Sequence, residues 1–189
     1  MKRGLLIVIS GPSAVGKDTV LRRLLELDPT LRYSVSATTR PPRPGEVDGA
    51  NYTFVTREGF QKLVEEGAFL EHAEYAGNLY GTLRDRVAQA REAGYDIVLK
   101  IDVQGAAQVR AKVPDGIFIF LSPPSMEELE HRQTMRDSET MEDRIARRKI
   151  AEQEMAYSKH FDHIVVNDDV EKAAGEILKI IRQARERQT

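Results

Sequence analysis

The sequence contains no cysteine among its 189 residues. This absence excludes disulfides, thiolate zinc sites and cysteine nucleophiles together. Long apolar stretches are lacking too, because the run Leu5–Ile9 falls far short of the roughly 20 residues that a membrane span needs. That run is also too short for the apolar part of a signal peptide, and no small-residue cleavage site follows it. We therefore expect a cytoplasmic protein with no membrane partner.

A large excess of one charge is missing as well. The formal net charge is −2, which argues against a general nucleic-acid coat or a polybasic membrane binder. The basic residues comprise 19 arginines and 9 lysines. The planar arginine guanidinium suits phosphate oxygens, although an arginine-rich composition more often reflects the composition of the whole genome than a phosphate-binding site. We expect no nucleic-acid partner, and the composition gives no oligomeric state.

The length and composition predict one folded domain. Hydrophobic residues make up 41% and charged residues 31%, as is ordinary for a globular chain. Short apolar runs alternate with longer segments of helical period, a pattern typical of a parallel sheet covered on both faces. The predicted strands are Leu5–Ile9, Leu31–Val35, Ile97–Ile101, Ile117–Leu121 and His163–Val166. The predicted helices are Lys17–Leu27, Leu83–Ala93, Gln104–Val113, Ser125–Arg136, Glu142–Tyr157 and Val170–Arg185.

Two segments interrupt the alternation. The stretch Ala37–Thr82 is too long for a plain loop, so we interpret it as an inserted subdomain. The polar segment Met135–Glu142 lies between two helical patterns and is interpreted as a lid. The insertion is expected to contain a Pro/Gly/Arg-rich loop at Arg40–Gly45, a strand at Tyr52–Val55, a helix near Thr56–Glu66 and a hairpin turn at Gly77-Asn78.

A phosphate-binding loop is indicated near the N-terminus. Residues Gly11–Lys17 fit G-x-x-x-x-G-K, follow a short apolar strand and open a helix, which is the context this motif requires. The glycines let successive N–H groups point at a phosphate, and the helix N-terminus adds its positive end. The alternative is a glycine-rich turn whose Lys17 is only a surface charge. The predicted ATP-binding residues here are Gly11, Pro12, Ser13, Ala14, Val15, Gly16, Lys17, Asp18 and Thr19.

The position after the motif lysine departs from the usual pattern. A serine or threonine normally supplies a hydroxyl to Mg²⁺ there, but this chain has Asp18, with Thr19 next. Asp18 either approaches the metal through water or occupies the first helical turn, where acids are favoured. The sequence leaves both readings open.

Further segments carry a family resemblance over nearly the whole chain. Together with the phosphate loop, they occur in an order and at a spacing that resemble guanylate kinase. These segments are Ser34–Tyr52, Phe69–Ala73, Asn78–Thr82, Lys100–Gly105, Phe120–Ser125 and Val165–Asp169.

The resemblance implies an α/β fold of the P-loop NTPase type. This is a three-layer sandwich with a five-stranded parallel sheet, an inserted monophosphate-binding α+β subdomain and a lid. The core would comprise residues 1–35, 83–125 and 150–189, the GMP-binding insertion residues 36–82, and the lid region residues 126–149. The implied activity is ATP-dependent phosphorylation of GMP to GDP in purine nucleotide metabolism, with Mg²⁺ bound together with ATP.

The resemblance also assigns roles to individual residues. The residues matching those that hold the monophosphate are Arg40, Arg43, Tyr52 and Tyr80. The residues matching the guanine pocket are Ser36, Glu71, Thr82 and Asp102. The residues that would act on the ATP phosphates are Lys17, Arg132, Arg136 and Arg148, and Asn167 matches the loop beside adenine. No protein metal ligand is assigned.

The chemistry of these residues agrees with the implied substrate. Guanine offers two donors on one edge, N1–H and N2–H, and the carboxylate of Glu71 can accept both. Adenine presents a bare acceptor instead, and a mismatch of this kind can discriminate by about 10⁴ or more. The hydroxyls of Ser36 and Thr82 can turn toward O6 or N7. Paired arginines with tyrosine hydroxyls suit an acceptor phosphate.

Two features depart from the family pattern. Lys100 stands where an acidic residue is usual, which puts the surroundings of the metal and phosphates in doubt. The lid has one residue more than the common pattern between Arg136 and Arg148, so Arg147 and Arg144 compete for the last arginine role. The alternatives to a GMP kinase are a non-catalytic guanylate-kinase-like binding module and a P-loop kinase of another small phosphate acceptor.

Overall fold

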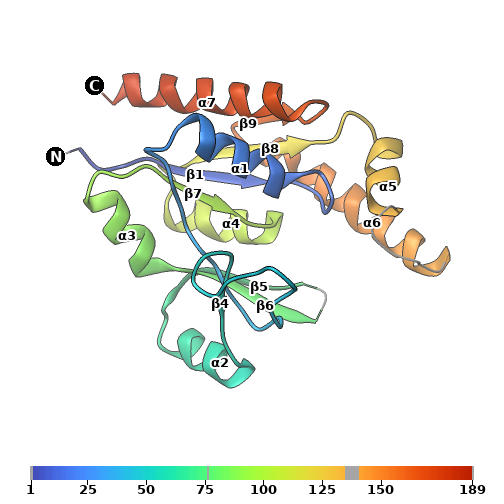
Figure 1. Ribbon diagram of the computed structural model, residues 1–189, viewed down its shortest axis with the longest axis horizontal. Helices are drawn as coiled ribbons and strands as arrows, with labels where there is room; N and C mark the ends of the chain where they lie inside the picture. The colour runs from blue at the N-terminus through green and yellow to red at the C-terminus, as the bar shows by residue number, and fades with distance from the viewer. Residues whose placement is uncertain (1, 76, 135–140, 189) are drawn as a thin grey trace. The chain divides into compact units, whose positions relative to one another are not determined.

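The computed structural model describes residues 2–75, 77–134 and 141–188 (Figure 1). The chain groups into two compact units. The first unit consists of residues 1–6, 31–99 and 104–116, and the second consists of residues 7–30, 100–103 and 117–189. Most of the predicted lid segment, including Arg136, lies outside the described residues.

Five parallel strands form one sheet, as the sequence predicts. Their order is β2-β7-β1-β8-β9, and the paired strands run parallel in regular register, with Ile7 opposite Ile117 and Ile119 opposite His163. The second strand is shorter than predicted, because only two residues of Leu31–Val35 pair with β7. The strands are β1 (Leu6–Ser10), β2 (Arg32–Tyr33), β7 (Ile97–Lys100), β8 (Ile117–Ser122) and β9 (His163–Val166).

In the second unit, the central strands and two long helices form the core. Every residue of β1 is buried, as expected for a parallel strand covered on both faces. Helices α1 (Lys17–Leu27) and α7 (Val170–Arg187) lie side by side (Figure 1) and bury apolar residues such as Leu24 and Ile177. The remaining helices of this unit are α5 (Met126–Thr134), α6 (Met141–Ala156) and the 3-10 turn η1 (Tyr157–His160).

The first unit contains a smaller, four-stranded sheet in the order β4-β3-β6-β5. Its apolar face packs around Phe60 and Phe69, whose rings stack with centroids 4.5 Å apart. The predicted hairpin at Gly77-Asn78 is confirmed, whereas β3 was not foreseen. The elements are β3 (Ala37–Thr38), β4 (Thr53–Phe54), α2 (Arg57–Glu65), β5 (Phe69–Tyr75), β6 (Asn78–Leu83), α3 (Arg84–Glu92) and α4 (Val103–Lys112), the last of which begins in the second unit.

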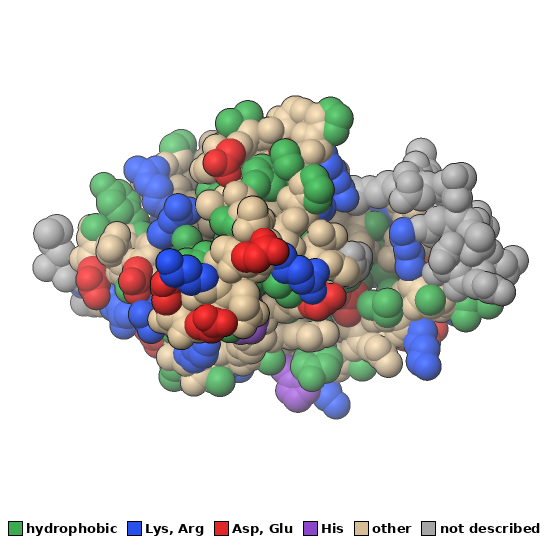
Figure 2. All heavy atoms as spheres, turned by 90° about the horizontal axis from the view of Figure 1, so that it is seen from below, with side chains coloured by type: hydrophobic (Ala, Val, Ile, Leu, Met, Phe, Trp, Pro, Cys, Tyr) green, Lys and Arg blue, Asp and Glu red, His purple; other side chains and the backbone are tan. Residues whose placement is uncertain are grey.

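The surface carries charges of both signs. On the face drawn in Figure 2, acidic and basic side chains are interspersed rather than gathered by sign, in keeping with a formal net charge of −2. Within the described ranges, no helix combines the length and the hydropathy needed to cross a membrane.

Candidate functional site

The phosphate loop connects β1 to α1 and requires glycine at two positions. Gly11 (φ 148°) and Gly16 (φ 99°) both adopt positive φ. A Cβ on Gly11 would come within 2.2 Å of the carbonyl oxygen of Leu121, and one on Gly16 within 2.5 Å of Asn167 Nδ2. Side chains at these positions are therefore excluded both by conformation and by space.

Lys17 folds back over this loop. Its ammonium donates hydrogen bonds to the carbonyl oxygens of Gly11, at 2.5 Å, and Pro12, at 2.9 Å. Burial lowers the pKa of Lys17 to about 8, while the charges of Glu154, Asp18 and Asp102 act in the opposite direction. At neutral pH the ammonium is thus largely charged and lies against the loop backbone.

Glu154, on α6, belongs to this site although no sequence motif indicates it. It is 9% exposed, and its carboxylate is hydrogen-bonded to the backbone of Ser13. Burial raises the pKa of Glu154, and the nearby charge of Lys17 counteracts this. In the sequence, Glu154 is one acid among many charges in a helical segment, and only the packing of α6 brings it to the loop.

Further contacts fix the loop from the side of α5 and from the segment after β9. Arg132 Nη1 donates to the carbonyl oxygen of Asn167 at 3.2 Å, and its Nε donates to Glu128 at 2.8 Å. Asn167, which is buried, donates from Nδ2 to the carbonyl oxygen of Val15 at 2.7 Å. Gln133, which the sequence also did not single out, donates to the carbonyl oxygen of Ser13 at 3.2 Å. The structure thus brings Arg132 and Asn167 to the predicted loop.

The other arginines of the predicted lid are placed differently. The guanidinium of Arg148 forms ion pairs with Glu130 and Glu152, each at 3.1 Å, and is therefore directed along the α5 and α6 surfaces. Arg136 and the side chain of Arg144 lie outside the described part of the chain, and Arg147 is half-buried on α6.

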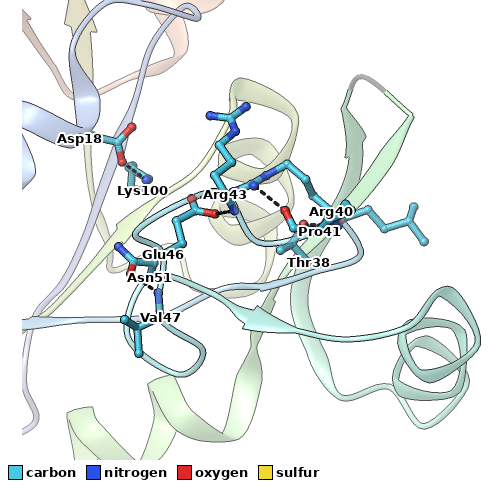
Figure 3. Close-up of polar contacts among 10 residues, drawn as sticks. Asp18, Thr38, Arg40, Pro41, Arg43, Glu46, Val47, Asn51 and Lys100 are labelled. Carbon is cyan, nitrogen blue, oxygen red and sulfur yellow. Dashed lines mark hydrogen bonds and ion pairs between the residues drawn. The ribbon is translucent and has the colours of Figure 1, made fainter.

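Asp18 and Lys100, two of the three departures from the expected patterns, form an ion pair with each other (Figure 3). The Lys100 side chain is 12% exposed and that of Asp18 is 82% exposed. Asp102, two residues after Lys100, lies close enough to Lys17 to raise its pKa. Both departures thus fall beside the phosphate loop.

In the first unit, the alternation of side chains in the small sheet places Ser36, Glu71 and Thr82, three of the four predicted guanine-pocket residues, on one face; the fourth, Asp102, belongs to the second unit. Ala37 lies opposite Gly81 and Glu71 lies opposite Thr82. Because side chains alternate along a strand, Thr82 and Glu71 share one face with Ser36, the residue before Ala37, while Ala37 and Gly81 belong to the other. That other face is closed by aromatic packing, since a Cβ on Gly81 would lie 2.7 Å from the Phe69 ring.

A β-bulge directs Glu71 to the polar face. Phe69 and Glu71 are two residues apart and would share a face in a regular strand, but the register shifts between them. Phe69 therefore packs into the core while Glu71 points the opposite way. Glu71 is only 4% exposed and accepts a 2.6 Å hydrogen bond from the Thr82 hydroxyl.

Three of the four predicted monophosphate residues gather beside this face. The guanidinium of Arg40 lies 5.4 Å from the centre of the Tyr52 ring and is hydrogen-bonded to the Tyr80 side chain. The Tyr52 and Tyr80 rings meet edge to face at 6.0 Å. Tyr80 points to the same side as Thr82, two residues further along β6. The structure thus brings Arg40, Tyr52 and Tyr80 together.

Glu46 organises the loop that carries both arginines, as Figure 3 shows. One carboxylate oxygen binds the Arg40 guanidinium at 2.8 Å, and the other accepts the backbone N–H of Arg43 at 2.7 Å. The hydrogen bond from Arg40 holds the pKa of Glu46 below its ordinary value. Glu46 lies within the motif segment Ser34–Tyr52, but the motif indicates no role for it.

Comparison with known proteins identifies the family. The family model described as guanylate kinase matches residues 3–184. The chain belongs to the guanylate kinase family. Guanylate kinase of Rubrobacter xylanophilus is 50% identical over 184 residues, covering 97% of this chain and 96% of the relative. That of Caldanaerobacter subterraneus subsp. tengcongensis is 49% identical over 180 residues, covering 95% and 87%.

A solved structure of a guanylate kinase agrees in fold. The crystal structure of guanylate kinase from Anaplasma phagocytophilum superposes with a TM-score of 0.81 at 36% sequence identity, covering 97% of this chain and 87% of that one. The P-loop NTPase fold implied by the resemblance is therefore confirmed.

Proposed function

We propose that this guanylate kinase family member transfers the γ-phosphate of ATP to GMP, giving ADP and GDP, and so serves purine nucleotide metabolism. The assignment of GMP as the phosphate acceptor rests on the buried carboxylate of Glu71, which accepts a hydrogen bond from the Thr82 hydroxyl on the polar face of the small sheet. A buried carboxylate there suits the two donors of guanine and leaves adenine mismatched. This supports GMP over another small acceptor.

The ATP half is assigned to the loop of the second unit. The backbone amides of residues 11–16 and the α1 N-terminus would hold the polyphosphate, and Lys17 would leave its carbonyl partners to bind the β- and γ-phosphates. Arg132 and Asn167 contact the loop backbone, which supports their assignment to the phosphates and the adenine side. Arg136 and Arg148 are assigned to the transferring phosphate by their motif positions. An intact loop also disfavours the binding-module alternative.

The acceptor phosphate is assigned to Arg40, Arg43, Tyr52 and Tyr80. Ser36, Glu71, Thr82 and Asp102 are assigned to the base. The GMP phosphate is largely ionised at neutral pH, because its second pKa is about 6, so no general base is required. These side chains align the acceptor and balance charge as the phosphoryl group moves.

The oxygen ligands near Lys17 are of the kind that bind Mg²⁺ together with ATP. The carboxylate of Asp102 lies near enough to Lys17 to influence its charge, and such an oxygen is what Mg²⁺ prefers. No group of three or more His, Asp or Glu side chains in the described ranges forms a dedicated metal cage. When bound, the ion neutralises charge between the phosphates.

The remaining assignments follow from this function. Residues 36–82 are proposed as the GMP-binding insertion, residues 126–149 as the lid region, and residues 1–35, 83–125 and 150–189 as the core. A cytoplasmic location is proposed, where both nucleotides are available.

A coupled assay of ADP release across several acceptors tests the proposal. With Mg·ATP as donor, GMP should support turnover, while AMP, UMP, dTMP and ribose 1,5-bisphosphate should support little. Turnover with ribose 1,5-bisphosphate in place of GMP would favour the alternative kinase. Binding of GMP without any ADP release would favour the binding module.

A further inference from the structure

The ion pair between Lys100 and Asp18 is strongly asymmetric in burial. Lys100 ends β7 with a side chain that is 12% exposed, whereas Asp18, in the first turn of α1, is 82% exposed. An ammonium withdrawn from water needs a counter-charge, because leaving it unpaired is costly. The exposed carboxylate loses little by returning to water. Asp18 is therefore the partner that can leave, while Lys100 stays in surroundings that favour an anion.

Lys100 also acts on the phosphate loop. Its charge lowers the pKa of Lys17, so the two ammonium groups lie within electrostatic reach of each other. Two neighbouring cations repel unless an anion lies near both. The N-terminus of α1 adds a further positive potential at the same place. The carboxylates of Asp18, Asp102 and Glu154 balance these charges, and Asp18 is the exposed one, so an entering polyanion displaces Asp18 first.

We propose that Lys100 is a second phosphate-binding cation of this site and that Asp18 is its exchangeable counter-ion, which nucleotide polyphosphate displaces. The proposal rests on the assignment of ATP to the phosphate loop. It explains why Asp18 and Lys100 occur together, since an aspartate at position 18 compensates the cation at position 100. The Asp18 carboxylate and the phosphate thus compete for the same cation, Lys100.

Binding of Mg-free ATP, measured by titration calorimetry at low ionic strength, tests the competition. Lys100→Met should weaken binding by about 10-fold or more, the loss expected for one charged hydrogen bond. Asp18→Asn should tighten binding severalfold, because the lysine no longer has to exchange partners. In the Lys100→Met background, Asp18→Asn should have a clearly smaller effect. Equal effects of Asp18→Asn in both backgrounds, or any weakening by it alone, would overturn the proposal.

Matched controls separate this role from a general charge effect. Lys172, in the same unit, is paired with Asp168 at 3.7 Å and is 75% exposed, so Lys172→Met should leave the Kd unchanged. Lys100→Arg keeps the charge and should retain binding within about threefold of the wild type. If Lys100→Met does not fold, Asp18→Asn still decides, because an exposed substitution that leaves ATP affinity unchanged contradicts the exchange.

The same titration distinguishes failure of the proposal from failure of the proposed function. A wild-type protein that binds no ATP would remove the assignment of the loop. A wild-type protein that binds ATP normally, with Lys100→Met binding equally well, would remove Lys100 alone.

Discussion

At the residue scale, the phosphate loop combines a functional charge with a cost in stability. Lys17 is held against two carbonyl oxygens, and burial lowers its pKa to about 8 from an ordinary value of 10.5. Because the folded state binds this proton less tightly than the unfolded state, the folded protein is penalised while Lys17 is charged. The full penalty applies below about pH 8 and disappears as the pH rises toward 10.5.

Replacing this lysine should therefore separate stability from activity. We expect Lys17→Met to raise the free energy of unfolding at pH 7 by about 1–3 kcal/mol, an advantage that shrinks above pH 8. Turnover should fall severely, while GMP binding is nearly unchanged. Urea unfolding at pH 7 and pH 10, with GMP calorimetry, checks this. A variant that is less stable than the wild type at pH 7 would contradict the burial argument.

Glu154 influences the protonation of Lys17. Its charge raises the pKa of Lys17, so Glu154→Gln should lower that pKa below about 8 and move the alkaline limb of kcat/KM for ATP to lower pH. Glutamine still accepts a hydrogen bond from the Ser13 backbone, whereas alanine does not, so Glu154→Ala should additionally raise the KM for ATP. Glu176→Gln, an exposed change on α7, is the control. An unshifted pH profile in Glu154→Gln would show that the two charges are not coupled in solution.

Glu71 should determine whether the acceptor pocket prefers guanine or adenine. Glu71→Gln keeps the shape but loses one acceptor, and we expect kcat/KM for GMP to fall by about 10- to 100-fold, the loss of one charged hydrogen bond. The Kd for ATP should change little, and the preference for GMP over AMP should narrow. Steady-state kinetics with both acceptors measures this. If affinity for ATP fell as much as affinity for GMP, Glu71 would not belong to the acceptor pocket.

At the element scale, sequence periodicity predicted most of the architecture, and local sequence alone could not predict the rest. The predicted helix Lys17–Leu27 and strand His163–Val166 match the structure at both ends. The strand expected at Leu31–Val35 is confirmed over only two residues, since pairing with β7 rather than local apolar content sets its length. The two-residue strand β3 carries no period to detect.

The candidate site likewise contains residues that the sequence could predict and residues that it could not. The phosphate loop was predictable because its glycines serve backbone conformations that the motif itself encodes. The bulge that turns Glu71 away from Phe69 depends on the partner strand, so no pattern within Phe69–Ala73 reveals it. Glu154 and Gln133 reach the loop only through helix packing. Sequence motifs therefore do not predict residues that reach the site through long-range packing.

Helix α7 offers a prediction at this scale. It begins at an N-cap, Asp169, whose carboxylate accepts the backbone N–H of Lys172 at 2.9 Å. Asp169→Ala leaves that N–H without this acceptor and should lower the free energy of unfolding by about 1 kcal/mol. Asp168→Ala, at the exposed neighbouring position, should cost less. Chemical denaturation of both variants checks this, and equal losses would exclude a specific capping contribution.

At the scale of the whole molecule, both units rely on carboxylates that are bound to arginines. Glu46 with Arg40 and Asp115 with Arg91 lie in the first unit, and the hydrogen bonds from these arginines lower the pKa of each acid. In the second unit, burial opposes ionisation of Asp28, but hydrogen bonds from Thr30 and Arg185 outweigh it and lower its pKa. The folded forms of both units therefore favour the ionised acids.

Acid should consequently destabilise the protein beyond what unpaired acids would cause. A carboxyl group whose folded pKa is lowered stabilises the fold above its unfolded pKa, and this contribution is lost as the pH falls through the folded value. We expect the free energy of unfolding to be level near neutral pH and to fall steadily below about pH 4. Asp28→Asn should be less stable than the wild type at pH 7, and the difference should narrow at pH 3, where the wild-type acid is also becoming neutral. Urea unfolding across this range measures both quantities, and a difference that is constant with pH would mean that the Asp28–Arg185 pair contributes through packing rather than through its charge.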